Sequence, residues 1–214
     1  MTPHDLPRFP GDGLFDGLAR AVCGAGCLPR KELYEAWEVA RRARRIFRGG
    51  RVVDLAAGHG LLAYVMLLLD DSSPLAIAVD RTFPASAVKL QAALTEAWPR
   101  LAGRVTYMTC GLDDVPLLET DVVVSAHACG KLTDVVLDRA AAARARVAVL
   151  PCCHDASSPA AVTLAGWMDG ALAIDANRAW RLEQRGYRIR TQTIAPDITP
   201  KSRLLLGEPA TGDT

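Results

Sequence analysis

An acidic residue and two glycines follow a short apolar run early in the chain, with the spacing D-x-x-x-G-x-G. Asp54 ends the run, and a turn of small residues containing Ala56, Gly58 and Gly60 leads into the apolar segment 61–67. A strand, a glycine turn and a helix in this order bind nucleotide-like ligands in open α/β sheets. Glycine lets the backbone approach a ligand closely and adopt φ angles that other residues avoid. The turn is therefore the first candidate binding element.

A second acidic residue favours the same interpretation. The apolar run 75–79 predicts a buried strand that ends at Asp80, with Arg81 next in the chain. An acid about 20 residues after the glycine turn is placed to accept hydrogen bonds from ribose hydroxyls, in NAD enzymes as in others. The turn lacks the third glycine that packs beside a pyrophosphate, so an NAD-dependent oxidoreductase is disfavoured. We expect a ligand without phosphates, S-adenosyl-L-methionine, bound by Asp54, the turn, Asp80 and Arg81.

The remaining strand ends carry further polar groups. Gly111, Leu112 and Asp113 follow the predicted strand 104–108, where backbone amides or a carboxylate would hold an adenine. Because the carboxyl ends of parallel strands meet at one edge of a sheet, these groups are expected beside the glycine turn.

Two loops rich in histidine and cysteine follow the next two strands. His127 and Cys129 lie in one loop, and Cys152, Cys153 and His154 lie in the other. A sulfonium already activates its methyl group, so a base is needed only for an acceptor with a proton of high pKa. His127 is the first candidate base and cofactor contact, with a core histidine as its alternative; His154 is the second candidate. Cys129 is a candidate catalytic residue or a small buried packing residue.

The elements that must position these residues alternate along the chain. Apolar runs predict strands over 51–54, 75–80, 104–108, 121–125, 146–150, 187–194 and 202–207. Helical spacing predicts helices over 30–48, 61–69, 84–98, 131–145 and 170–186. The pattern indicates an α/β, Rossmann-like, seven-stranded and mostly parallel sheet with helices on both faces. We expect an N-terminal arm over 1–29, loose or forming a short helix, a single domain over 30–209 and a tail over 210–214.

Composition limits the other classes. The chain has 214 residues, a net charge of +1 and six cysteines. With no apolar run long enough to span a bilayer and no signal-peptide pattern, reduced thiols and a cytoplasmic location are expected. A zinc site built from Cys23, Cys27, Cys152, Cys153 and His154 has poor ligand spacing, so no metal is expected.

Basic residues gather near the end of the helix predicted over 30–48. They are Arg41, Arg42, Arg44, Arg45, Arg48 and Arg51. The first interpretation is a solvated helix C-terminus, where the helix dipole favours cations. The second is a phosphate-binding patch for RNA.

The two histidine–cysteine loops resemble a family signature. Residues 126–134, Ala-His-Ala-Cys-Gly-Lys-Leu-Thr-Asp, and 151–154, Pro-Cys-Cys-His, resemble the "H-x-C-G-x-x-T-D … P-C-C-H" pattern of class I S-adenosylmethionine-dependent methyltransferases. The similar groups are the tRNA 2′-O-methyltransferases of the Trm13 type, the methyltransferase-like 25 group and the glutathione S-transferase C-terminal-domain-containing proteins. The stretch 198–207 resembles the family's "T-P-K-N-R-L-L-L", and 173–178 is also similar. The resemblance covers roughly residues 30 to 209.

Methyl transfer to RNA is the function weakly favoured by the resemblance and the arginines. Transfer to a small molecule or peptide, and a non-catalytic partner protein that binds S-adenosylmethionine, are the alternatives. Four residues outside the loops are left with two interpretations each. Asp175 and Arg178, three apart on one helix face, form an ion pair or take part in the site, and Lys201 and Arg203 contact an anionic substrate or serve the fold. Asp134 caps or orients the helix of its loop together with Thr133, and direct participation in the site is its alternative.

Overall fold

A seven-stranded mixed sheet forms the centre of the molecule, in a computed structural model that describes residues 1–210. The strand order is β3-β2-β1-β4-β5-β7-β6, and every neighbouring pair is parallel except those that involve β7. The strands are β1 (Val52–Leu55), β2 (Ala76–Asp80), β3 (Val105–Thr109), β4 (Val122–Ser125), β5 (Arg146–Val149), β6 (Tyr187–Thr193) and β7 (Arg203–Pro209). The predicted Rossmann-like, mostly parallel sheet is confirmed.

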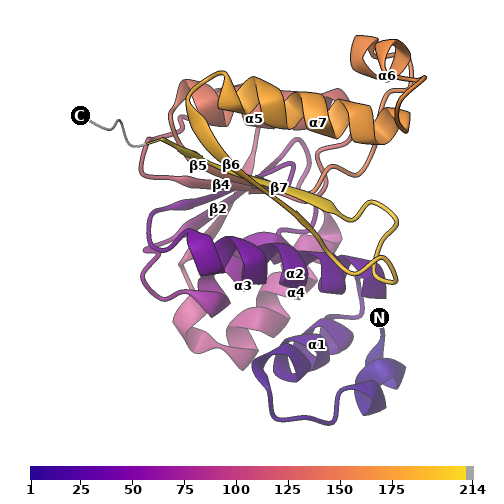
Figure 1. The fold of residues 1–214 in the computed structure, drawn as a ribbon. Helices are drawn as coiled ribbons and strands as arrows, with labels where there is room; N and C mark the ends of the chain where they lie inside the picture. The colour runs from indigo at the N-terminus through magenta and orange to yellow at the C-terminus, as the bar shows by residue number, and fades with distance from the viewer. Residues whose placement is uncertain (211–214) are drawn as a thin grey trace.

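Helices cover both faces of this sheet (Figure 1). One face carries α2 (Arg30–Ile46), α3 (Leu61–Leu69) and α4 (Ala85–Ala97), and α1 (Leu14–Ala25) packs against α4 and α2, farther from the sheet. The other carries α5 (Lys131–Ala142) and α7 (Gly170–Glu183), with the short α6 (Pro159–Thr163) beyond the end of α7. Short 3-10 helices span Pro3–Arg8, Pro99–Leu101 and Leu112–Asp114.

The central strands β1, β4 and β5 are buried on both sides, because successive side chains point to opposite faces and helices cover both faces. Val52 belongs to the apolar cluster shared with α1–α4, and Val53 belongs to the cluster shared with α5 and α7. Both valines have no exposed surface. Burial of this kind explains why the central strands are continuous apolar runs rather than alternating ones.

Residues 1–29 contain a packed helix. Leu18 and Val22 of α1 are fully buried in the cluster that includes α2 and α3, and Gly26 ends the helix with a φ of 60°. Of the two possibilities raised for this segment, loose arm or short helix, the structure has the helix. The domain boundaries drawn from the sequence stay a prediction, and the expected tail lies outside the described residues except for Ala210.

Arg42, in the second half of α2, donates to Gln192 near the carboxyl end of β6 at 3.0 Å. Arg51 lies at the amino edge of the sheet, because it directly precedes β1. Its guanidinium binds Asp121, the residue before β4, at 2.7 Å. Arg44 is 2% exposed and pairs with Asp70 at 3.2 Å, and burial lowers its pKa to about 10 although Asp70 opposes this effect. At least these two arginines hold the fold together.

Within residues 1–210, no helix is both long and apolar enough to cross a membrane.

Candidate active site

The turn after β1 adopts the left-handed backbone that its sequence predicted. Ala56, Gly58 and Gly60 have φ angles of 57°, 54° and 77°. A Cβ placed on Gly60 would lie 3.3 Å from the Cβ of Ala78, tighter than ordinary contact. A non-glycine residue with positive φ, such as Ala56, stores strain of the kind that gathers at binding sites.

Asp80 joins this turn to the end of β2. Its Oδ2 accepts the backbone N–H of Gly58 at 2.9 Å, and its Oδ1 accepts the N–H of Arg81 at 2.7 Å. The hydroxyl of Tyr107, on β3, donates to the carbonyl of Gly58 at 2.6 Å. Burial, helped by the negative charges of Asp80 and Asp54, raises the pKa of Tyr107 to about 12, so it keeps its proton. Tyr107 was not among the predicted site residues.

Asp54 is a buried acid with an unused oxygen. The residue is 1% exposed, and no described residue donates a hydrogen bond to its Oδ2. Burial raises the pKa of this carboxyl well above its ordinary value, against a backbone N–H from Ala63 and together with the charge of Asp80. An unpaired buried acceptor beside a glycine turn fits a ligand that brings positive charge or N–H groups, as the ammonium and sulfonium groups of S-adenosylmethionine do.

The loop after β3 is only partly directed at the site. The N–H of Cys110 donates to the carbonyl of Asp80 at 3.0 Å, so the backbone of Gly111 and Leu112 follows directly beside the acid. The side chain of Asp113 is 88% exposed and lies 3.7 Å from Arg139 on α5. The N–H of Gly111 donates to Oδ2 of Asp114 at 2.9 Å, within the same loop. Adenine binding by Gly111, Leu112 and Asp113 stays a prediction.

His127 lies next to the glycine turn. Its Cδ2 is 4.0 Å from the position that a Cβ on Gly58 would take, and the ring is partly buried. The structure thus brings together the two segments that the sequence singled out first. Whether the imidazole acts as a base stays a prediction.

A second histidine, His59, lies within the glycine turn itself. His59, inside the glycine turn, lies with its Nε2 3.3 Å from Glu32 on the first turn of α2 and its Nδ1 2.5 Å from the hydroxyl of Ser86. The hydrogen bond with His59, aided by the charge of His127, lowers the pKa of Glu32 against burial. The sequence analysis missed both residues. His59 carried a signal, being one of four histidines and inside the motif, whereas Glu32 carried none.

The loops after β4 and β5 bring three thiols together. The sulfur atoms of Cys129, Cys152 and Cys153 all lie within 4.8 Å of one another, with Cys129 and Cys152 at 2.8 Å. Burial and the neighbouring thiol of Cys129 raise the pKa of Cys152. Cys129 and Cys153 are exposed, so the interpretation of Cys129 as a buried packing residue is wrong.

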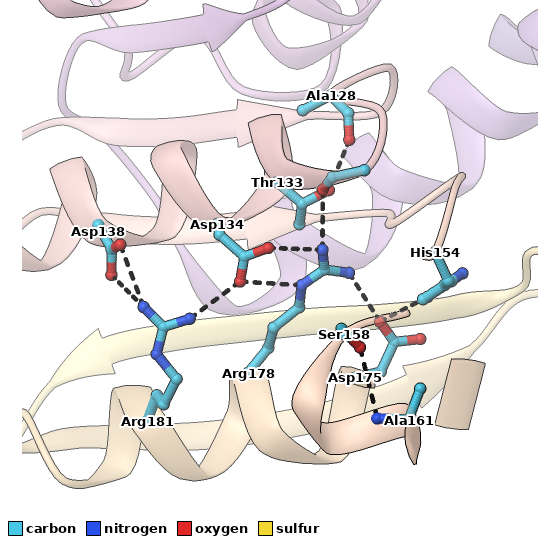
Figure 2. Close-up of polar contacts among 11 residues, drawn as sticks. Ala128, Thr133, Asp134, Asp138, His154, Ser158, Ala161, Asp175, Arg178 and Arg181 are labelled. Carbon is cyan, nitrogen blue, oxygen red and sulfur yellow. Dashed lines mark hydrogen bonds and ion pairs between the residues drawn. The ribbon is translucent and has the colours of Figure 1, made fainter. Parts of the chain in front are cut away.

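His154 is bound to α7 through a carboxylate (Figure 2). Its Nε2 lies 2.8 Å from Oδ1 of Asp175, and its side chain is 5% exposed. Arg178 is 3.2 Å from the same Asp175, which confirms the ion pair, and Arg203 binds the other carboxylate oxygen at 2.7 Å. Within residues 1–210 nothing pairs with Nδ1 of His154. Arg203 is thus engaged inside the protein, and the catalytic role of His154 stays a prediction.

Arg178 connects this group to the loop after β4. It donates to the carbonyl of Gly130 at 2.9 Å and pairs with Asp134 at 2.8 Å. Asp134 also pairs with Arg181, and Thr133 donates to the carbonyl of Ala128 at 2.5 Å. Asp134 and Thr133 therefore fix the loop helix, Asp134 through arginines of α7 and Thr133 through the backbone.

A cavity of about 470 Å³ opens between α7 and the strands β6 and β7. It lies at the carboxyl edge of the sheet, because Pro151 follows β5 and Thr193 ends β6. Asp175 and Arg203 contribute polar atoms to its wall. Its apolar lining residues are Leu172, Ala176, Ala179, Leu204 and Leu205.

Comparison with known proteins agrees with this arrangement. The family model described as a methyltransferase domain matches residues 35–158, more than half of the chain. A glutathione S-transferase C-terminal domain-containing protein of Xenopus laevis is 27% identical over 122 residues, which cover 40% of this chain and 20% of that protein. The chain thus spans about a fifth of the length of this curated relative.

Solved structures share the fold. The B. subtilis tRNA methyltransferase TrmK has a TM-score of 0.54 and 17% identity over 82% of this chain and 65% of its own. An O-methyltransferase family protein from Burkholderia thailandensis has a TM-score of 0.51 and 18% identity over 98% of this chain and 64% of its own. The chain belongs to the methyltransferase-domain family, whose members are enzymes that take their methyl group from S-adenosyl-L-methionine.

Proposed function

We propose that this domain methylates a small molecule with an apolar body, bound in the cavity between α7 and β7. The cavity is the observation that carries the proposal. Its volume, about 470 Å³, lies within the range of small-ligand sites, roughly 300–1,000 Å³. It opens at the same sheet edge as the glycine turn. Strands β4 and β7 are two positions apart, about 10 Å at the usual strand spacing, so an elongated acceptor would reach from the cavity to the loop after β4.

The donor side is assigned to the β1–β3 half of the edge. Asp80 would accept hydrogen bonds from the ribose hydroxyls, and the backbone of Gly111 and Leu112 would face the adenine. Asp54 would balance the positive charge of the donor, whose sulfonium supplies the activated methyl group. The protein then has to align the acceptor and exclude water.

His127 is the proposed base. It lies against the glycine turn and comes from the loop that also reaches the thiols. An imidazole is suited to remove a proton near neutral pH from an acceptor that needs activation. His154 and Cys129 remain secondary candidates, His154 because its ring is already held by Asp175.

The arginine positions do not favour RNA as the acceptor. Arg45 lies thirteen positions after Glu32, which is at the donor side, so the two are about 20 Å apart along the helix. Arg42 is paired with Glu38. Arg44 and Arg51 are engaged with Asp70 and Asp121. RNA is therefore kept as an outcome of the test.

Incubating the protein with a labelled methyl donor and cell extract, then fractionating the extract, distinguishes a small-molecule acceptor from RNA. Wild type is compared with Ala176→Trp, which fills the cavity, and with Glu183→Trp, an exposed position further along α7. We expect label in the small-molecule fraction, lost at least tenfold in Ala176→Trp and kept in Glu183→Trp. Titration with S-adenosylhomocysteine should show equal donor affinity in all three. Nuclease-sensitive label, or transfer unaffected by Ala176→Trp, would refute the small-molecule proposal.

A further inference from the structure

We propose that Cys129, Cys152 and Cys153 together bind one thiophilic divalent metal ion of the zinc type. The ligands come from the loops after β4 and β5, which the neighbouring positions of these strands bring side by side. The inference does not depend on the proposed acceptor, because metal uptake is measured directly.

The sulfur positions are close to those that a metal requires. With metal–sulfur bonds of about 2.3 Å, tetrahedral thiolates lie about 3.8 Å apart. The three sulfurs here span separations from 2.8 Å up to at most 4.8 Å. Rotation about side-chain bonds adjusts such distances, and two of the three residues are exposed. Backbone rearrangement is not needed to form a three-sulfur set.

Binding converts three neutral thiols and a dication into a three-thiolate complex with one net negative charge, and releases three protons. One feature of the surroundings favours that charge. Cys129 lies at the N-terminus of the 12-residue helix α5, where Gly130 is the N-cap residue and helix dipoles favour anions.

The zinc set weighed from the sequence is replaced by this one. Cys23 has no exposed surface and belongs to the apolar core on α1. The thiol of Cys27 donates to the carbonyl of Ser86 at 3.5 Å. Cys152 and Cys153 instead find Cys129, which the earlier set did not contain. Three protein ligands leave the fourth position of a tetrahedral ion to water or an exogenous ligand, as in open zinc sites.

The test titrates reduced, metal-free protein with Cd²⁺ and follows sulfur-to-metal charge-transfer absorption, then repeats the titration with Zn²⁺ against a chromophoric chelator. We expect one equivalent bound and about three protons released per ion. Affinity should fall at least tenfold in Cys129→Ser and in Cys153→Ser, whereas the control Cys27→Ser keeps it. Circular dichroism of the metal-free variants checks that each is folded.

Two results would overturn the site. One is the absence of a charge-transfer band in the reduced wild type, or a band that Cys129→Ser leaves unchanged. The other is a Cys129–Cys152 disulfide, seen as a loss of two hydrogens by mass, in a protein that takes up no metal after reduction. That second result would identify the close pair as a redox couple instead.

Discussion

The buried guanidinium of Arg178 gives the sharpest test of how α7 holds the site loops. Its side chain is 3% exposed and contacts Asp134, Asp175 and the carbonyl of Gly130. Substitution by Met keeps a long, flexible side chain but removes the charge and every donor. Arg181, one turn further along α7, provides the control: it also pairs with Asp134 but is 37% exposed.

The burial of each arginine determines how much free energy of unfolding its substitution removes. Removing one partner of a buried ion pair costs about 3–5 kcal/mol, because the other charge stays buried without compensation. Asp175 keeps His154 and Arg203, and Asp134 keeps Arg181, so we expect the lower end, about 3 kcal/mol, for Arg178→Met. An exposed pair contributes about 0–1 kcal/mol, which is the loss expected for Arg181→Met.

Urea denaturation followed by circular dichroism measures both free energies of unfolding under the same conditions. A loss for Arg178→Met that is no larger than the loss for Arg181→Met would refute the reasoning. It would mean that the network around Asp134 and Asp175 is not the connection between α7 and the loop after β4.

Two further predictions concern the donor side. Gly60→Ala should lose about 1–2 kcal/mol of unfolding free energy and bind S-adenosylhomocysteine more weakly, because its φ is 77° and the new Cβ would lie 3.3 Å from Ala78; unchanged values in calorimetry and denaturation would contradict this. Asp54→Asn should remove a pH-dependent loss of stability. Because the native pKa of Asp54 is raised by burial, the folded state holds its proton above about pH 3.9, and wild-type stability falls as the pH rises from there through the native pKa. Denaturation at a series of pH values should show the free energy of unfolding of Asp54→Asn rising relative to that of wild type as the pH rises. Two parallel curves of unfolding free energy against pH would contradict the prediction.

Local sequence patterns predicted much of the fold and of the donor side. The strand, turn and helix around Gly58 and the acid at the end of β2 were predictable because each depends on neighbours in the sequence. The alternation of apolar runs also predicted the sheet. The helix α1 was only one of two possibilities, since its stability comes from tertiary burial of Leu18 and Val22 rather than from its glycine-containing sequence.

Contacts between distant segments could not be predicted in the same way. Cys129 and Cys152 are 23 residues apart, and His154 and Asp175 are 21 apart, so their pairing depends on how whole elements pack. The basic cluster was predictable only in part, because a row of arginines looks alike in sequence whether it faces solvent or is buried. Arg45 and Arg48 are exposed, as a solvated helix end predicts. Arg44 reaches inward to Asp70, a partner that no local spacing reveals.

The last strand of the chain has a consequence for biosynthesis. β7 lies between β5 and β6 although it follows both in sequence, so this edge of β5 has no partner until β7 leaves the ribosome. An unpaired strand edge is a template for association with other chains. A nascent polypeptide that still lacks β7 would therefore expose an unpaired strand edge during translation, and chaperone binding should decrease once β7 has paired with β5 and β6.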